Sequence, residues 1–296
     1  RSTLFPYTTL FRSQPLADLV IKNARVYREG DLFDGGIAVK DGRIVSVSED
    51  AFLPEASDTI DAKGMAVLPG VIDTHVHVRD PGHRERGTFA SETKAAAAGG
   101  VTSFLEHPIS SPPPYSPEIL RRRIEVAKPQ SMVDYAFFGA AGSEFPEEVL
   151  KVAREGIVAF KTFLHQAPEG REDEFRGLTM ADDGGIMDGF QSVAKTGLIL
   201  TIHAENNDMI KRLIAQFRAE GKTGFEYHAK SRPPITEIES VEKLIRFAKE
   251  YGTRISIAHT STPEAMELIQ QAKAEGQDIY RSEEHTSELQ SPTSIS

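Results

Sequence analysis

The 296-residue chain contains no cysteine, which excludes a disulfide framework, a thiolate metal site and a cysteine nucleophile. Any metal ion would have to be held by histidine, a carboxylate or a modified lysine. Positive charge is also scarce, because 34 Lys and Arg stand against 44 Asp and Glu and leave a net charge of −10. This balance argues against nucleic acid or an anionic membrane as a partner.

Long apolar runs are missing as well. No stretch approaches the roughly 18 apolar residues of a membrane span, and the N-terminus lacks the continuous apolar segment of a secretory signal. We therefore expect a cytoplasmic protein with no membrane partner. The length suits a single α/β barrel.

The two ends resemble translated sequencing adapters. Residues 3–13 (TLFPYTTLFRS) match the translation of one adapter, and residues 281–291 (RSEEHTSELQS) match the translation of the opposite one. We therefore treat residues 1–13 and 281–296 as adapter-like artefacts and exclude them from the predicted fold. The expected protein is a window cut from a longer gene.

Residues 14–66 are predicted to form a small N-terminal β domain. Apolar and polar residues alternate in LVIKNARVY, GGIAVKDGRIVSVS and DTIDAKG, and no helix-length periodic segment intervenes. The dipeptide Asp41-Gly42 is a strong hairpin signal, because glycine tolerates positive φ.

Residues 67–280 are predicted to form a partial (β/α)8 barrel of the TIM type, the catalytic domain. Six apolar strands alternate with amphipathic segments, a pattern typical of a parallel sheet. The strands are AVLPGVIDTHVHV, TSFLEHP, DYAFFGAAG, GIVAFKTFL, LILTIHAE and RISIAHTS. Since eight units need roughly 250 residues, about six of the eight are expected. Ile255 and Ile257 in the last strand would then face an unpaired edge.

The predicted helices carry recognisable end signals. Ser116 is the expected N-cap of one helix, and Thr262 repeats the same entry before another. Thr236 and Glu239 match a capping box for a helix that closes on Gly252.

The segment THVHVRD, at the end of the first barrel strand, points to a metal site. Side chains alternate along a strand, so His75 and His77 share one face. Two adjacent imidazoles are costly to bury without a partner, and a metal ion is the usual one. The alternative is a surface strand with two solvated histidines.

Three further strands carry a polar residue that packing does not require. Lys161 interrupts an apolar run, and His203 and His259 lie at strand ends. Each alone could be structural, since a lone histidine often sits at the rim of a core and a lysine can extend from an edge strand. Together they lie at the carboxyl ends of barrel strands, where barrel enzymes place their sites. A cationic lysine beside a dication would be repelled, so Lys161 must be neutral or modified, for example carbamylated.

With these residues the window resembles the cyclic amidohydrolase branch of the amidohydrolase superfamily, which comprises dihydroorotases, allantoinases, hydantoinases and dihydropyrimidinases. The resemblance implies two divalent metal ions, most simply Zn²⁺. By the family pattern, His75 and His77 bind the more buried ion, His203 and His259 bind the second, and carbamylated Lys161 bridges both. It further implies that a metal-bridging hydroxide opens the ring C–N bond of a small cyclic amide or ureide.

The substrate remains open between dihydroorotate, allantoin and hydantoin types. Arg79 matches the dihydroorotase pattern H-x-H-x-R, in which an arginine binds the substrate carboxylate. An ion pair of Arg79 with Asp80 or a nearby acid is the alternative. The segment LEHPISSPPP is closer to allantoinases. His107 is expected at the rim, with lining of the pocket as the alternative, and no role is assigned to His83, His165 or His228.

Two other functions compete with this interpretation. A non-catalytic relative of the same fold could act in assembly or binding, and a metal-free barrel could bind a small molecule. The resemblance also implies a catalytic aspartate after the eighth strand, which no position here matches. We therefore expect the chain as given to be inactive and the full-length form to be an active homo-oligomer.

Overall fold

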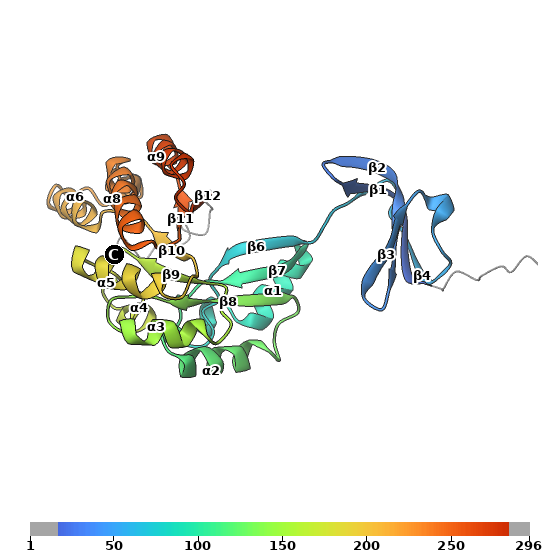
Figure 1. Cartoon of the computed structure of the whole chain (residues 1–296), viewed down its shortest axis with the longest axis horizontal. Coiled ribbons are helices and arrows are strands. Elements are labelled where there is room, and N and C mark those ends of the chain that lie inside the picture. The colour runs from blue at the N-terminus through green and yellow to red at the C-terminus, as the bar shows by residue number, and fades with distance from the viewer. Residues whose placement is uncertain (1–16, 284–296) are drawn as a thin grey trace, which may run out of the picture. The chain divides into compact units, whose positions relative to one another are not determined.

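The computed structural model describes residues 17–283. The adapter-like head and most of the adapter-like tail therefore lie outside the described residues. The chain divides into two compact units between Gly70 and Val71 (Figure 1). Each unit is described by itself.

The smaller unit is a β sheet in the order β3-β2-β1-β4, with β5 paired to β1. Val20 and Val26, both on β1, are buried in two separate apolar clusters. A bulge between Ile21 and Ala24 interrupts the pairing of β1 with β2. The elements of this unit are β1 (Ala17–Arg28), β2 (Asp31–Lys40), β3 (Arg43–Ser48), the 3-10 helix η1 (Asp50–Phe52), β4 (Ala56–Asp61) and β5 (Ala66–Val67).

The turn between β2 and β3 is the predicted two-residue turn. Lys40 pairs with Arg43 across it. Both turn residues have positive φ, 51° at Asp41 and 70° at Gly42. Such a turn matches the twist of antiparallel strands, and glycine adopts it without steric strain. The hairpin prediction is confirmed.

The larger unit is built on a parallel sheet whose strands follow one another in chain order, from β6 to β12. The sheet curls as part of a barrel, with helices along its outer side (Figure 1). This confirms the predicted partial barrel. The strands are β6 (Val71–Val76), β7 (Val101–Glu106), β8 (Asp134–Ala140), β9 (Ala159–Phe163), β10 (Leu200–His203), β11 (Ile255–Thr260) and β12 (Ile279–Glu283).

The described sheet has one strand more than the six predicted. Ile255 and Ile257 of β11 pair with Ile279 and Arg281 of β12, so this strand includes the first residues of the adapter-like tail. Ile279 is 1% exposed and belongs to the main core. The prediction of an unpaired edge at β11 is therefore wrong, because an open strand edge readily pairs with an extended segment.

Helices follow the strands as the alternating pattern predicts. The 3-10 helix η2 (Arg84–Arg86) and α1 (Phe89–Ala98) follow β6, and α2 (Pro117–Ala127) follows β7. The remaining helices are α3 (Pro146–Ala153), α4 (Glu172–Phe175), α5 (Asp183–Ala194), α6 (Asn207–Ala219), α7 (Glu226–Lys230), α8 (Ile235–Tyr251) and α9 (Pro263–Ala274). Ser116 and Thr262 cap α2 and α9 as predicted, because each side chain accepts a backbone N–H of the first turn.

The capping box predicted at α8 is wrong. The helix begins at Ile235, after Pro234, so Thr236 lies inside it. The Thr236 hydroxyl donates to the carbonyl of Pro233 at 2.8 Å, and Glu239 accepts a bond from Asn206 at 2.6 Å. Proline has the backbone angle of a helical first turn, so the tandem prolines start the helix earlier than a cap at Thr236 would. The predicted end at Gly252 is confirmed by its φ of 66°.

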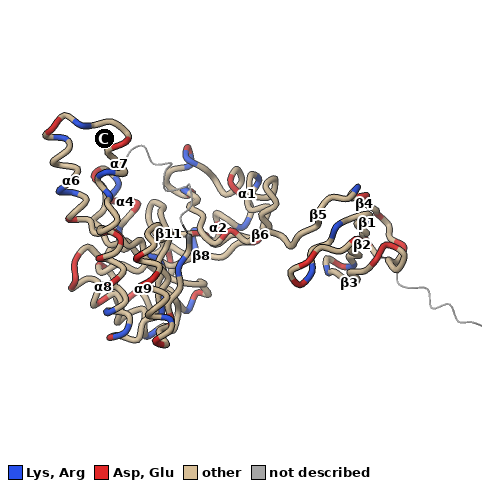
Figure 2. Tube along the Cα trace, turned by 90° about the horizontal axis from the view of Figure 1, so that it is seen from above, with Lys and Arg blue, Asp and Glu red and all other residues tan. Residues whose placement is uncertain are grey.

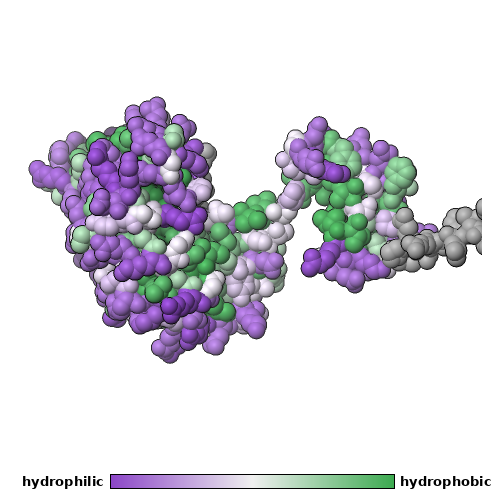
Figure 3. Space-filling model, in the orientation of Figure 1, coloured by the Kyte–Doolittle hydropathy of each residue, from purple (hydrophilic) through white to green (hydrophobic). Residues whose placement is uncertain are grey.

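The main core of the larger unit lies between strands and helices. It includes Phe104, Phe160, Leu200 and Ile257 from the strands and Leu120, Phe190 and Leu244 from the helices. Acidic and basic residues lie on the outer helices of this unit, α8 and α9 among them (Figure 2). Apolar surface remains over β6 (Figure 3), where Val71 and Ile72 are more than half exposed. Within residues 17–283, no helix is both long and apolar enough to cross a bilayer.

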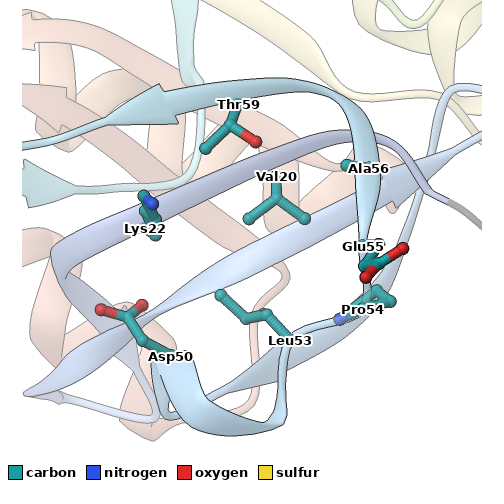
Figure 4. A pocket seen from close by; sticks show the side chains of 8 residues that line it. All are labelled: Val20, Lys22, Asp50, Leu53, Pro54, Glu55, Ala56 and Thr59. Atoms are coloured by element: carbon teal, nitrogen blue, oxygen red, sulfur yellow. The ribbon is translucent and has the colours of Figure 1, made fainter.

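A hollow of about 370 Å³ lies on the smaller unit (Figure 4). It is lined by Val20, Lys22, Asp50, Leu53, Pro54, Glu55, Ala56 and Thr59. It contains none of the histidines singled out above, so it is separate from the predicted site.

Candidate metal centre

The predicted ligands come from four strands of the parallel sheet. His75 is on β6 and His77 directly follows it; Lys161 is on β9, His203 ends β10, and His259 is on β11. Since the carboxyl ends of parallel strands lie at one edge of the sheet, residues far apart in sequence meet there. The structure brings all four histidines into ring contact, as two pairs joined by His75 and His259.

The first pair is formed by His75 and His77. Their Nε2 atoms lie 3.2 Å apart. Nδ1 of His77 lies 3.3 Å from the backbone carbonyl of His107. Burial, with smaller contributions from His107 and Arg79, holds the pKa of His77 well below its usual range. The ring is therefore neutral at neutral pH, which is the form that binds metal ions.

The second pair is formed by His203 and His259. Nδ1 of His203 lies 3.0 Å from Nε2 of His259. The other ring nitrogen of His203 lies 2.9 Å from a carboxylate oxygen of Glu205. Carboxylates and carbonyls in this position commonly orient metal-binding histidines. In each pair, one ring is therefore oriented by a contact of the ring nitrogen that faces away from the other histidine.

The two pairs meet at His75 and His259, and a buried lysine lies near the first pair. The rings of His75 and His259 are 5.8 Å apart between centroids, with an angle of 29° between their planes. Lys161 is fully buried, and its Nζ lies 4.9 Å from the centre of the Phe163 ring. Its charge is among the causes that lower the pKa of His77 and of His107. The lysine therefore lies within electrostatic reach of the first pair.

His259 has an unusual backbone conformation. Its φ is 42°, and the pairing of β11 with β12 shifts register between Ile257 and Thr260. Bulges of this kind redirect side chains and are frequent beside active sites. A left-handed conformation costs a non-glycine residue of order 1–3 kcal/mol and is retained where the surroundings fix it. The bulge thus fixes the position of the ring that faces His203.

The donor set fits two metal ions with a shared ligand. Within residues 17–283, no three His, Cys, Asp or Glu side chains are gathered around one point. The predicted site does not need such a group, because each ion would take two histidines and share Lys161. Two nitrogens bound at about 2.0–2.1 Å to one tetrahedral zinc ion lie roughly 3.3 Å apart. The separations of 3.2 and 3.0 Å are close to this value.

Three side chains at the site were not predicted to belong to it. His107 was expected at the rim, but it is 2% exposed and stacks on His75 with 3.9 Å between ring centroids. His165 lies edge-to-face with His203 at 5.7 Å, and burial lowers its pKa to about 4. Glu205 contacts His203. Their location in the sequence could have identified these side chains, because each of the three follows the end of a strand by one or two residues.

Arg79 forms an ion pair with the buried carboxylate of Glu174, on α4. The sequence analysis gave an ion pair of Arg79 with Asp80 or a nearby acid as the alternative. Such a pair is present, and the acid is Glu174 and not Asp80. Asp80 lies 3.6 Å from Arg84 instead. The predicted contact of Arg79 with a substrate carboxylate stays a prediction.

Comparison with known proteins identifies the family of the chain. The model of the amidohydrolase family matches residues 66–292, more than half of the chain. The chain belongs to the amidohydrolase family. Among its curated relatives is an allantoinase of Desulfitobacterium hafniense, 37% identical over 265 residues, which cover 89% of this chain and 57% of the relative. An L-hydantoinase of Paenarthrobacter aurescens is 34% identical, with 89% and 56% covered.

Solved structures place the chain in the same branch of the amidohydrolases. The L-hydantoinase (dihydropyrimidinase) from Arthrobacter aurescens superposes with a TM-score of 0.82 and 33% identity, over 90% of this chain and 58% of that one. A D-hydantoinase gives 0.77 and 31%, over 90% and 57%. The amidohydrolase described here therefore spans a little over half the length of these relatives. The resemblance to cyclic amidohydrolases is confirmed.

Proposed function

We propose that this protein is a metal-dependent hydrolase that opens a ring C–N bond in a cyclic amide or ureide of the hydantoin or allantoin type. The observation that carries the proposal is the meeting of two histidine pairs, the first of which lies within electrostatic reach of a fully buried lysine. Relatives named allantoinase and L-hydantoinase support the substrate class.

The proposed cofactors are two zinc ions. His75 and His77 would hold one, and His203 and His259 the other, through the nitrogens that face each other within each pair. Lys161, as its carbamate, would provide an anion with two oxygens between them. Such a carbamate is favoured over an ammonium group because a buried cation beside two dications would be strongly repelled.

The chain's own residues prepare the site for this chemistry. When bound, two such ions lower the pKa of a water molecule toward neutrality and polarise the ring carbonyl. Burial keeps the His77 ring uncharged, so its Nε2 lone pair is available for coordination. Glu205 accepts a hydrogen bond from Nε2 of His203, which leaves Nδ1 to face His259. The carbonyl of His107 orients His77 in the same way.

We further propose that the substrate ring carries no carboxylate group near Arg79. The guanidinium of Arg79 is engaged with Glu174. A substrate carboxylate would have to displace a buried counter-ion to reach it, which costs several kcal/mol. An uncharged hydantoin or allantoin ring avoids this cost.

The test uses the product of the complete gene, with hydantoin, allantoin and dihydroorotate as substrates. We expect ring opening that a chelator abolishes and zinc restores, together with two zinc ions per chain by elemental analysis. His203→Ala should lose activity and bound metal, whereas the control His228→Ala, on α7, should keep both. Full occupancy by zinc without any ring opening would favour the non-catalytic relative. Absence of bound metal in the unaltered protein would contradict the proposal.

A further inference from the structure

Three arginines and a histidine converge on the carboxylate of Glu174. Arg171 donates to both oxygens at 2.9 Å, and Arg79 forms a shorter ion pair with the same group. Arg86 lies 3.4 Å away, and His83 lies 3.6 Å away. We call these five residues the Glu174 cluster.

The buried part of this cluster holds more positive than negative charge. The side chain of Glu174 is only 2% exposed, and those of Arg79 and Arg171 are 16% and 19% exposed. The other acids that contact the cluster, Glu85 and Asp173, are 70% and 55% exposed. Without Glu174, two largely buried guanidinium groups would therefore lack a buried counter-ion.

Glu174 is held in its ionised form. Burial opposes ionisation, but the hydrogen bonds and charges of Arg171 and Arg79 keep the pKa of this carboxyl below its ordinary value. An ionised carboxylate between guanidinium groups matches the shape and charge of a bound carboxylate ligand. The carboxylate of Glu174 thus supplies the negative charge between the arginines that a bound anionic ligand would otherwise supply.

The cluster adjoins the candidate metal centre. Arg79 follows His77 by two residues. Arg171 lies 5.1 Å from the centre of the Phe175 ring, and Phe175 contacts the ring of His165, which in turn contacts His203. Glu174 lies in the segment after β9, the strand that carries Lys161. The neighbouring Asp173 accepts a hydrogen bond from Ser111, in the segment after β7. Segments that follow three strands therefore meet beside the site.

From these contacts we infer that Glu174 is a specificity-determining residue, whose carboxylate occupies the guanidinium group of Arg79 and so excludes rings that carry a carboxylate. This inference rests on the proposed function for the identity of the site. If Glu174 is neutralised, the same arginines become a receptor for an anionic ring.

The test compares Glu174→Gln with Glu169→Gln, which removes an exposed acid from the same segment, in the product of the complete gene. The probes are orotate and uracil, the same ring with and without a carboxylate, and binding is measured by calorimetry. We expect Glu174→Gln to bind orotate about tenfold or more tightly than the unaltered protein does, because it gains a charge-assisted pair. Affinity for uracil, and both affinities of the control, should be unchanged. The ratio of kcat/KM for dihydroorotate to that for hydantoin should rise in parallel.

Adding Arg79→Met to Glu174→Gln should remove the gained affinity. If Glu174→Gln does not fold, as judged by circular dichroism, Glu174→Gln with Arg171→Gln removes one charge of each sign and keeps Arg79 available. A folded variant without improved orotate binding would overturn the inference, as would failure of both variants to fold. Tight orotate binding by the unaltered protein would overturn it too. Absence of hydrolysis by the unaltered protein would contradict only the proposed function, because the binding measurements need no turnover.

Discussion

The carboxylate of Glu205 determines which nitrogen of His203 can face His259. A neutral imidazole has one N–H, and the contact at 2.9 Å places it on Nε2, toward the carboxylate. The lone pair of Nδ1 then points at His259. Arg232 approaches the same carboxylate at 3.9 Å. Glu205 is therefore a positioning residue for the proposed second ion.

Glu205→Ala should weaken zinc binding at this position by about 10–100-fold, the usual effect of losing a residue that orients a metal-bound histidine. Titration of the metal-free protein with zinc should resolve one weakened site and one unchanged site. Glu220→Ala, at the exposed end of α6, is the matched control and should leave both sites unchanged. Equal weakening of both sites would show that Glu205 acts on the whole site rather than on His203.

At the scale of single residues, the sequence pointed to the four histidines that meet in the structure more clearly than to the residues that contact them. His75, His77, His203 and His259 stand out because each interrupts or ends an apolar strand. The contact between Arg79 and Glu174 joins residues 95 positions apart. Nothing in the local sequence of either residue specifies the other, since the pairing depends on how the segments after β6 and β9 pack. His107 was misjudged for the same reason, because its burial comes from stacking on His75 and Phe138.

At the scale of elements, α2 carries three consecutive arginines with different environments. Arg123 is 1% exposed and pairs with Glu106, at the end of β7, while Arg121 is 62% exposed and pairs with Glu155. Successive helical residues point about 100° apart, so only one of the three faces the sheet. Arg123 also donates to the carbonyl of Val78, just after His77. It therefore links α2 to the end of β7 and to the segment that follows β6.

Arg123→Met should lower the free energy of unfolding by about 3–5 kcal/mol, because it leaves the carboxylate of Glu106 buried without its partner. Arg121→Met removes a similar contact at the surface and should cost about 0–1 kcal/mol. Denaturant unfolding of the two variants, followed by circular dichroism, measures the difference. Equal losses would mean that burial does not decide the strength of these pairs.

The helix ends were predicted correctly where a single residue determines the end. Ser116, Thr262 and Gly252 each act through their own side chain or backbone, so a local pattern suffices. The capping box at Thr236 failed because Pro233 and Pro234 compete for the same helix start. The seventh strand was missed because residues from Arg281 onward had been excluded from the predicted fold.

At the scale of the whole molecule, the two units have separate cores. Val26 is buried in a cluster made only of residues from the smaller unit, and the main core is made only of residues from the larger one. Separate cores allow separate local unfolding. The expected homo-oligomer stays a prediction, since it concerns the assembled full-length form.

Val26→Ala should destabilise the smaller unit by about 1–3 kcal/mol through lost burial and a residual cavity. Hydrogen exchange followed by mass spectrometry should show faster exchange in β1, β2 and β4 but not in β7 to β10. Leu244→Ala, in the core of the larger unit, should produce the reverse pattern. Faster exchange throughout in both variants would show that the two units unfold as one.

The strands of the parallel sheet are neighbours in the same order as they occur in the sequence. This order affects how the sheet can form while the protein is being synthesised. Each strand from β7 to β12 pairs with the strand that precedes it along the chain. During translation the sheet can therefore lengthen one strand at a time, without waiting for a distant partner. His75 and His77 arrive with the first strand of this sheet, whereas His203 and His259 arrive with the fifth and sixth. The nascent chain thus emerges with one histidine pair long before the other.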